Sequence, residues 1–232
     1  MNDTAQIQFF YDPISPYAYL AFAQLPKALE GLSYSVRYTP ILFAAMLKIH
    51  GQLGPAEIAP KRDWTYRQVL WQAKQLEVDF QMPAAHPFNP LPLLRLAVAC
   101  SDEDGNTNRF VTQQIFNHVW GETEDGAAQD AADPERLAKL TEALAYKFKL
   151  GCEPTSDAVK ARLKANTEKA LRAGMFGVPS FVVGEDASQK VFWGLDSLPM
   201  LREYLEGSAW FDSQTTNGWN SVVTIEVGIK RI

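Results

Sequence analysis

The sequence predicts an α/β fold in which a mixed four-stranded β-sheet is interrupted by a large, all-helical insertion. Strand-like stretches occur only towards the two ends of the 232-residue chain, whereas apolar residues in the middle follow helical spacing almost throughout. The chain opens with a strand, a helix and a second strand, an order that favours a right-handed crossover between parallel strands. It closes with two short strands and a helix.

The N-terminal part supplies the first strand, helix and strand. Residues 6–11 (QIQFFY) are rich in aromatic side chains and predict a buried strand. A breaker cluster, residues 12–16 (DPISP), separates this strand from a helix that ends near Gly31. Residues 33–39 (SYSVRYT) alternate and predict the second strand. The apolar face of the helix is formed by Tyr17, Leu20, Ala21, Leu25 and Leu29.

The middle of the chain predicts five helices after a transition over residues 40–60. That transition holds a short apolar segment followed by a loop rich in Gly and Pro. Asp133 is expected to cap one of the helices and Ser156 or Thr155 another, and the acidic stretch 122–133 is expected to be a solvated loop. The helices are expected at 64–80 (marked by Trp64, Leu70, Trp71, Leu76 and Phe80), 91–100, 110–120, 134–150 and 156–173.

The C-terminal part returns to strand patterns. Residues 179–183 (PSFVV) and 190–193 predict two short strands that are close enough to form an antiparallel hairpin. Residues 196–205 predict a closing helix with Asp196 as its N-cap. The tail from residue 208 contains VVTIEVGI, which has a strand-like or extended pattern.

This element order is that of a thioredoxin fold with helices inserted in the middle. We therefore predict a discontinuous thioredoxin-like domain, residues 1–61 plus 174–232. The inserted helical domain is predicted to span residues 62–173.

Composition excludes several classes of protein. The formal net charge of −5 argues against a general nucleic-acid binder, which normally carries a basic face. Apolar residues make up 47% of the chain, yet no apolar run is long enough for a membrane span, and the N-terminus lacks a signal-peptide pattern. Two cysteines and three histidines without metal-ligand spacing exclude a disulfide scaffold and predict no metal site. These features predict a soluble cytoplasmic protein.

The expected place for chemistry in such a fold is the start of the first helix. Here the sequence reads Ser15-Pro16-Tyr17-Ala18, so it lacks the Cys-x-x-Cys that a dithiol oxidoreductase needs. Ser15 followed by Pro16 is typical of a helix N-cap. The same hydroxyl could donate a hydrogen bond to an anion bound in the positive field of the helix terminus, and the two roles are compatible.

Two further segments belong to the same region of a thioredoxin-like fold. Val178-Pro179 is a candidate cis peptide, and Val178 could offer its backbone N–H and C=O to an extended peptide. The alternative is an ordinary proline at the entry of a strand. Asp196 could bind an α-amino group and Ser197 the adjoining carboxylate, although Asp196 could equally serve only as a cap.

Five motifs in order carry a resemblance to a known family. FYDPISPYAYL, FGVPSFVV and FWGLDSL resemble the signatures of the kappa-class glutathione transferases and the 2-hydroxychromene-2-carboxylate isomerases. Members of this group are DsbA-like thioredoxin-fold proteins in which serine replaces the first active-site cysteine. MLKIHGQLGPAEI and HPFNPLPLLRL fall between these motifs, and they make the isomerase branch the closer match. The resemblance covers residues 6–206.

The resemblance implies roles for individual residues. It makes Ser15 the residue that activates glutathione, and Val178 the backbone partner of its cysteinyl unit. The segment that holds the γ-glutamyl end is Gly194, Leu195, Asp196 and Ser197. Lys48 matches a lysine that faces the substrate carboxylate. Asn89 lies where the family has a substrate-contacting asparagine, and Arg95, a further candidate, follows on the same segment. Their alternatives are an exposed lysine, a helix-start asparagine and a surface arginine.

The resemblance implies a glutathione-dependent isomerase that interconverts 2-hydroxychromene-2-carboxylate and trans-o-hydroxybenzylidenepyruvate, or close aromatic-acid analogues. Glutathione would be the cofactor, with its thiolate stabilised by Ser15. Two alternatives stay open: a kappa-like glutathione transferase or peroxidase, and a non-catalytic thioredoxin-fold binding protein. Members of this family often dimerise, so a homodimer is compatible with the resemblance. We expect no nucleic-acid or membrane partner.

Overall fold

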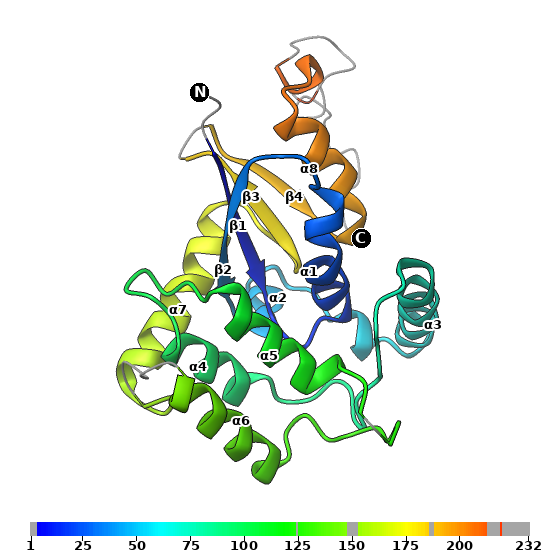
Figure 1. Cartoon of the computed structure of the whole chain (residues 1–232), viewed down its shortest axis with the longest axis vertical. Helices are drawn as coiled ribbons and strands as arrows, with labels where there is room; N and C mark the ends of the chain where they lie inside the picture. Colours follow the sequence, from blue (N-terminus) through cyan, green and yellow to red (C-terminus); the bar gives the residue numbers. More distant parts are fainter. Residues whose placement is uncertain (1–3, 124, 148–152, 186–187, 213–218, 220–232) are drawn as a thin grey trace.

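A four-stranded sheet with the order β2-β1-β3-β4 forms the centre of the structure (Figure 1). The structure is a computed structural model that describes residues 4–123, 125–147, 153–185, 188–212 and 219. The strands are β1 (Ala5–Tyr11), β2 (Tyr34–Pro40), β3 (Ser180–Val183) and β4 (Lys190–Trp193). β1 and β2 are parallel, whereas β3 pairs antiparallel with both β1 and β4. The predicted mixed sheet and hairpin are confirmed.

Helices cover both faces of this sheet. α1 and α8 lie on one face, together with α5 from the helical part, and α2 and α7 lie on the other (Figure 1). The helices are α1 (Pro16–Ala28), α2 (Phe43–Ile49), α3 (Ala59–Leu76), α4 (Leu91–Ala99), α5 (Arg109–Trp120), α6 (Pro134–Lys147), α7 (Asp157–Arg172) and α8 (Leu198–Leu205). Short 3₁₀ turns are η1 (Pro55–Glu57), η3 (Leu195–Ser197) and η4 (Ala209–Phe211).

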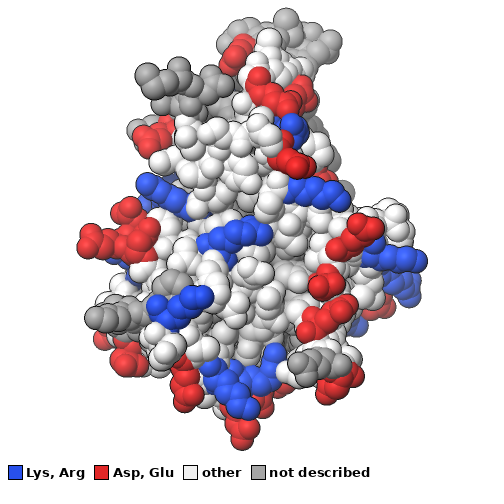
Figure 2. All heavy atoms as spheres, in the orientation of Figure 1, with Lys and Arg blue, Asp and Glu red and all other residues white. Residues whose placement is uncertain are grey.

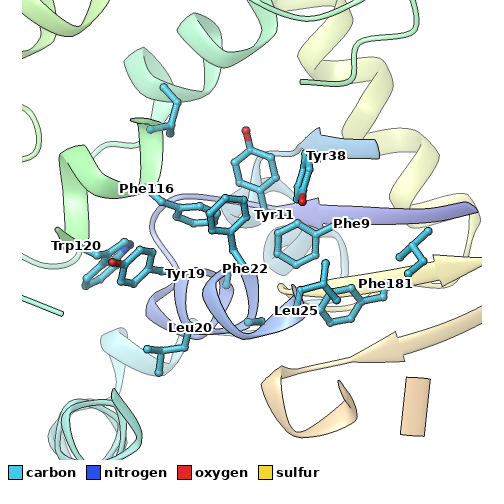
Figure 3. Close-up of a cluster of buried hydrophobic side chains, with 14 of the residues drawn as sticks. Phe9, Tyr11, Tyr19, Leu20, Phe22, Leu25, Tyr38, Phe116, Trp120 and Phe181 are labelled. Carbon is cyan, nitrogen blue, oxygen red and sulfur yellow. The ribbon is translucent and has the colours of Figure 1, made fainter. Parts of the chain in front are cut away.

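The aromatic run of β1 explains why this strand is central. Alternate side chains of a strand point to opposite faces, so Phe9 and Tyr11 enter the core beneath α1 while Phe10 enters the core beneath α2 and α7. Phe9 stacks on Phe181 of β3 with ring centroids 4.9 Å apart, and Tyr11 lies 5.2 Å from Phe116 of α5 (Figure 3). These contacts fix the carboxyl end of β1, from which the loop to α1 departs.

The indole side chains that mark the predicted helix at residues 64–80 do not form its buried face. Trp64 and Trp71 are 63% and 60% exposed, and the fully buried side chains are Val69 and Ala73. Small side chains let α3 approach its neighbours closely, which a face of indole rings would prevent. The helix also ends at Leu76, so Phe80 lies beyond it. The apolar segment in the transition forms α2, a seven-residue helix that the sequence pattern did not predict.

A segment of the helical part also borders the outer edge of β2. The backbone N–H of Thr107 donates to the carbonyl of Tyr38 at 2.7 Å, and the Asn166 side chain donates to the carbonyl of Pro40 at 3.2 Å. Both acceptors lie in the last three residues of β2. The helical part is therefore joined to the sheet by backbone contacts as well as by apolar packing.

Some sequence expectations fall on residues that are not described. Cys152 and the VVTIEVGI stretch of the tail lie outside the described residues. In the described part of the chain, no helix is both long and apolar enough to cross a membrane. On the face shown in Figure 2, acidic and basic side chains are interspersed and no large area carries a single sign of charge.

Candidate active site

Ser15 is the N-cap residue of α1, at the end of the loop that connects β1 to α1 (Figure 1). Its backbone is extended, with φ −91° and ψ 115°, and its Oγ accepts a hydrogen bond from the N–H of Ala18 at 3.2 Å. The predicted cap role is confirmed. The hydroxyl proton is directed to the carbonyl of Val178 at 3.4 Å, which is a long hydrogen bond. The cap thus fixes the oxygen and leaves the proton weakly held.

Val178 lies beside this hydroxyl because the turn before β3 faces the start of α1. The Val178–Pro179 peptide bond is cis, and Val178 is 8% exposed. The carbonyl of Pro179 accepts a hydrogen bond from the N–H of Gly194 at 3.0 Å. This bond brings the turn after β4 next to the turn before β3.

The segment from Gly194 to Ser197 forms a tight turn at the same end of the sheet. Gly194 has φ 95°, and a Cβ atom at this position would collide with the carboxylate of Asp196. The prediction that Asp196 is the N-cap of α8 is wrong. Asp196 lies inside η3, and α8 begins only at Leu198. Its carboxylate is therefore exposed instead of bound to a helix terminus. The Ser197 hydroxyl is engaged by the carbonyl of Gly194 at 2.8 Å.

Tyr17 connects this turn to α3. Its hydroxyl donates to Gln68 Oε1 at 2.7 Å. Burial raises the pKa of Tyr17, and the nearby carboxylate of Asp196 raises it further. Since a tyrosine with a raised pKa stays protonated, Tyr17 keeps its hydrogen bond to Gln68 of α3 in the presence of the Asp196 carboxylate.

A groove of about 540 Å³ opens next to Asp196. It lies between α1, α3 and the start of α8, and it gives the exposed carboxylate an adjoining space. Its lining side chains come from Gln24, Lys27, Ala28, Trp71, Gln72, Gln75, Leu76, Leu195, Asp196, Leu198, Pro199 and Arg202.

Asp12 is a buried acid that the sequence pattern did not single out. Its two carboxyl oxygens accept backbone hydrogen bonds from Ile14 at 3.0 Å and Phe43 at 2.9 Å. Burial raises the pKa of Asp12 to about 7, although both hydrogen bonds act in the opposite direction. The carboxyl group therefore joins the Ser15 loop to the first residue of α2. The only available signal was an acidic residue directly after a buried aromatic strand.

The three predicted substrate residues lie in α2, in the loop before α4 and in α4. Lys48 is exposed in the last turn of α2, five residues or about 7.5 Å of helix beyond Phe43. Asn89 is exposed, and its Oδ1 accepts the N–H of Leu91 at 3.1 Å, as a helix-start asparagine does. Arg95 lies within α4 and is half-buried. Among the described residues, Nε of Arg95 is buried without a hydrogen-bond partner.

The histidines make structural contacts. His50, His86 and His118 each place Nε2 within 3.1 Å of a backbone carbonyl, those of Met175, Ile14 and Ala131 respectively. No group of three His, Cys, Asp or Glu side chains among the described residues could hold a metal ion.

Comparison with known families agrees with the fold. The profile of the DSBA-like thioredoxin domain matches residues 6–206. The chain belongs to this family. A solved structure of a 2-hydroxychromene-2-carboxylate isomerase has the same fold as this DSBA-like chain, with a TM-score of 0.67 and 24% identity over 87% of this chain and 94% of that one. The cytosolic disulfide reductase DsbM from Pseudomonas aeruginosa also shares the fold, with a TM-score of 0.52 and 16% identity over 88% of this chain and 100% of that one.

Curated relatives of this DSBA-like chain are named as enzymes. The 2-hydroxychromene-2-carboxylate isomerase of Pseudomonas sp. (strain C18) is 28% identical over 87% of this chain and 91% of its own length. Glutathione S-transferase kappa 1 of Rattus norvegicus is 26% identical over 88% of this chain and 92% of its own length. The resemblance seen in the sequence motifs is confirmed.

Proposed function

We propose that this chain is a cytoplasmic, glutathione-dependent isomerase. It would interconvert 2-hydroxychromene-2-carboxylate and trans-o-hydroxybenzylidenepyruvate, or close aromatic-acid analogues. The observation that carries the proposal is the Ser15 hydroxyl, held at the N-terminus of α1 and beside the Val178 carbonyl. The relatives named as isomerases and as kappa-class transferases support it, since they align along almost the whole chain.

The chemistry of the available groups fits glutathione. A thiol or thiolate needs a hydrogen-bond donor in a positive field, which a serine hydroxyl at a helix N-terminus supplies. A cysteinyl backbone can pair with the N–H and C=O of Val178 as it would with a strand edge. The ammonium of a γ-glutamyl group needs a carboxylate, and Asp196 is exposed next to a groove. When bound, glutathione would supply a thiolate nucleophile that adds reversibly to a conjugated carbon.

In this proposal each residue of the chain has a defined task. The N–H of Ala18 fixes the oxygen of Ser15, so that rotation of the hydroxyl alone is enough to turn its proton from Val178 towards a sulfur atom. Lys48 would neutralise the substrate carboxylate and favour negative charge developing on the substrate. Asn89 and Arg95 would contact the aromatic acid.

A glutathione titration followed by ultraviolet difference spectroscopy tests the proposal. We expect a saturable thiolate band in wild type, its loss in Ser15→Ala, and at least a tenfold loss of isomerase turnover in that variant, or about 1.4 kcal/mol of barrier. Ser15→Ala also removes a helix cap worth about 1 kcal/mol. Ser156→Ala removes the matching cap of α7 and serves as the control, which should keep the band.

Two results would count against the proposal. Wild-type turnover in Ser15→Ala would refute the role of Ser15. Absence of any band in wild type at millimolar glutathione would favour a non-catalytic binding protein.

A kappa-like transferase is the second candidate, favoured by the relative from Rattus norvegicus. An isomerase returns glutathione unchanged after each turnover, whereas a transferase or peroxidase consumes it. The stoichiometry of glutathione with chromene carboxylate and with standard transferase substrates separates the two.

A further inference from the structure

The backbone that leads into Ser15 is held by side chains from a distant part of the sequence. The carbonyl of Pro13 accepts a hydrogen bond from Nε1 of Trp120 at 2.8 Å, and the carbonyl of Ile14 lies 2.8 Å from Nε2 of His86. The two pairs are separated by 107 and 72 residues. Both donors belong to the helical part between β2 and β3, so the helical part fixes the loop of the thioredoxin-like part.

The hydrogen-bond partners of His86 define the state of its ring. A carbonyl oxygen only accepts, so Nε2 carries a proton and donates it to Ile14. The hydroxyl of Tyr66 in α3 has one proton, which it shares between the carbonyl of His86 at 2.9 Å and Nδ1 of His86 at 2.7 Å. Burial lowers the pKa of His86 and so favours the neutral ring, in which Nδ1 can accept from Tyr66. Tyr66 therefore helps to keep Nε2 directed at the Ser15 loop.

Packing restricts the same ring. Its centroid lies 5.5 Å from that of Trp120 and 6.1 Å from that of Phe88. Trp120 is in turn stacked on Phe80, with an interplanar angle of 15° between the two rings. The N–H of Gln81 donates to the Trp120 carbonyl at 2.8 Å. The segment that carries His86 is thus tied to the end of α5.

We propose that His86 is a positioning residue for Ser15, because its Nε2–H holds the Ile14 carbonyl and thereby fixes the residue that precedes the serine. The field of a helix terminus falls off within one turn, and misplacement of a reacting group by about 1 Å can cost a hundredfold in rate. Small movements of the loop would therefore weaken the stabilisation of an anion at this site. The link to glutathione rests on the proposed function, whereas the positioning of residue 15 does not.

A Ser15→Cys background measures this positioning without glutathione. The pKa of the new thiol is read from the pH dependence of its alkylation, with the unmodified chain as the control for Cys100 and Cys152. His86→Gln places an amide nitrogen near the position of Nε2 and keeps the donor to Ile14. His86→Asn reaches only the position of Nδ1 and loses that donor, while His86→Phe keeps the ring packing and loses both hydrogen bonds.

At a pH below the pKa of the thiol at residue 15, we expect the thiolate fraction to fall about threefold in His86→Asn and His86→Phe. In His86→Gln it should change by less than about 1.5-fold. The same order should appear in the thiolate band of glutathione bound to Ser15 chains. Equal thiol pKa values in all four folded proteins, checked by circular dichroism, would overturn the inference. A missing glutathione band in wild type would instead reject the proposed function and leave the thiol measurement decisive for His86.

Discussion

Asp12 gives the structure a pH-dependent stability that can be isolated by one substitution. The carboxyl group is fully buried, and its pKa is raised by burial from the ordinary value of 3.8 to about 7. An acid with a raised pKa binds its proton more tightly in the folded state. Its contribution to stability is therefore complete below pH 3.8 and is lost as the pH rises to about 7.

The size of this effect follows from the two pKa values. Their difference corresponds to about 4 kcal/mol in total, of which about 3 kcal/mol should be lost between about pH 5 and about pH 8. Asp12→Asn removes the titration but leaves one of the two backbone donors, from Ile14 or Phe43, facing an amide NH₂. That mismatch costs about 1–3 kcal/mol at every pH. Wild type should thus lose its advantage over the variant as the pH rises.

Urea unfolding followed by tryptophan fluorescence at several pH values measures this difference. Burial lowers the pKa of His86 and His118, so their contribution is present above pH 6.5 and is lost as the pH falls. Because both histidines remain in the variant, their contribution cancels in the comparison. Asp157→Asn is the control, since that exposed acid has a lowered pKa and should give no change of slope above about pH 5. Parallel stability curves for wild type and Asp12→Asn would refute the reasoning.

Two further predictions concern Gly194 and Cys100. Gly194→Ala should destabilise the fold by about 1–3 kcal/mol and also weaken glutathione binding, because φ is 95° and the new Cβ would displace the Asp196 carboxylate. Gly207→Ala is the control, because Gly207 has φ 81° with open space around it. Calorimetry should show that this variant is destabilised but binds glutathione normally. Equal glutathione binding by the two variants would contradict the prediction. Burial raises the pKa of Cys100 to about 11, so a Cys152→Ala chain should be alkylated at about pH 8 roughly a hundredfold more slowly than free cysteine. Alkylation at the rate of free cysteine would show that the thiol is not protected.

Much of the fold could be predicted from local patterns. The aromatic strand at residues 6–11, the alternating strand at 33–39 and the caps at Ser15 and Ser156 all lie where the sequence places them. These features depend on neighbouring residues only. The end of α3 was predicted wrongly, because the apolar spacing continues to Phe80 whereas the helix ends at Leu76, where Glu77 adopts a left-handed conformation with φ 55°.

The site was predicted only in part for a related reason. Ser15, Val178 and Gly194 are marked by local motifs, and hydrogen bonds link each of their turns to the next. The contact of His86 could not be predicted, because its partner, Ile14, is 72 residues away and offers only a backbone carbonyl. A backbone acceptor has no identity in the sequence, so no pattern could reveal the contact.

The contacts on the outer side of β2 also determine how much of that sheet edge another strand could use. The carbonyls of Tyr38 and Pro40 accept hydrogen bonds from Thr107 and Asn166, so the C-terminal half of β2 has no free acceptor at these two positions. An incoming strand could pair only with the N-terminal half of β2, around Tyr34 and Val36. An edge this short is a poor template for intermolecular β-pairing. The inserted helical part therefore shortens the edge of β2 that is open to intermolecular pairing.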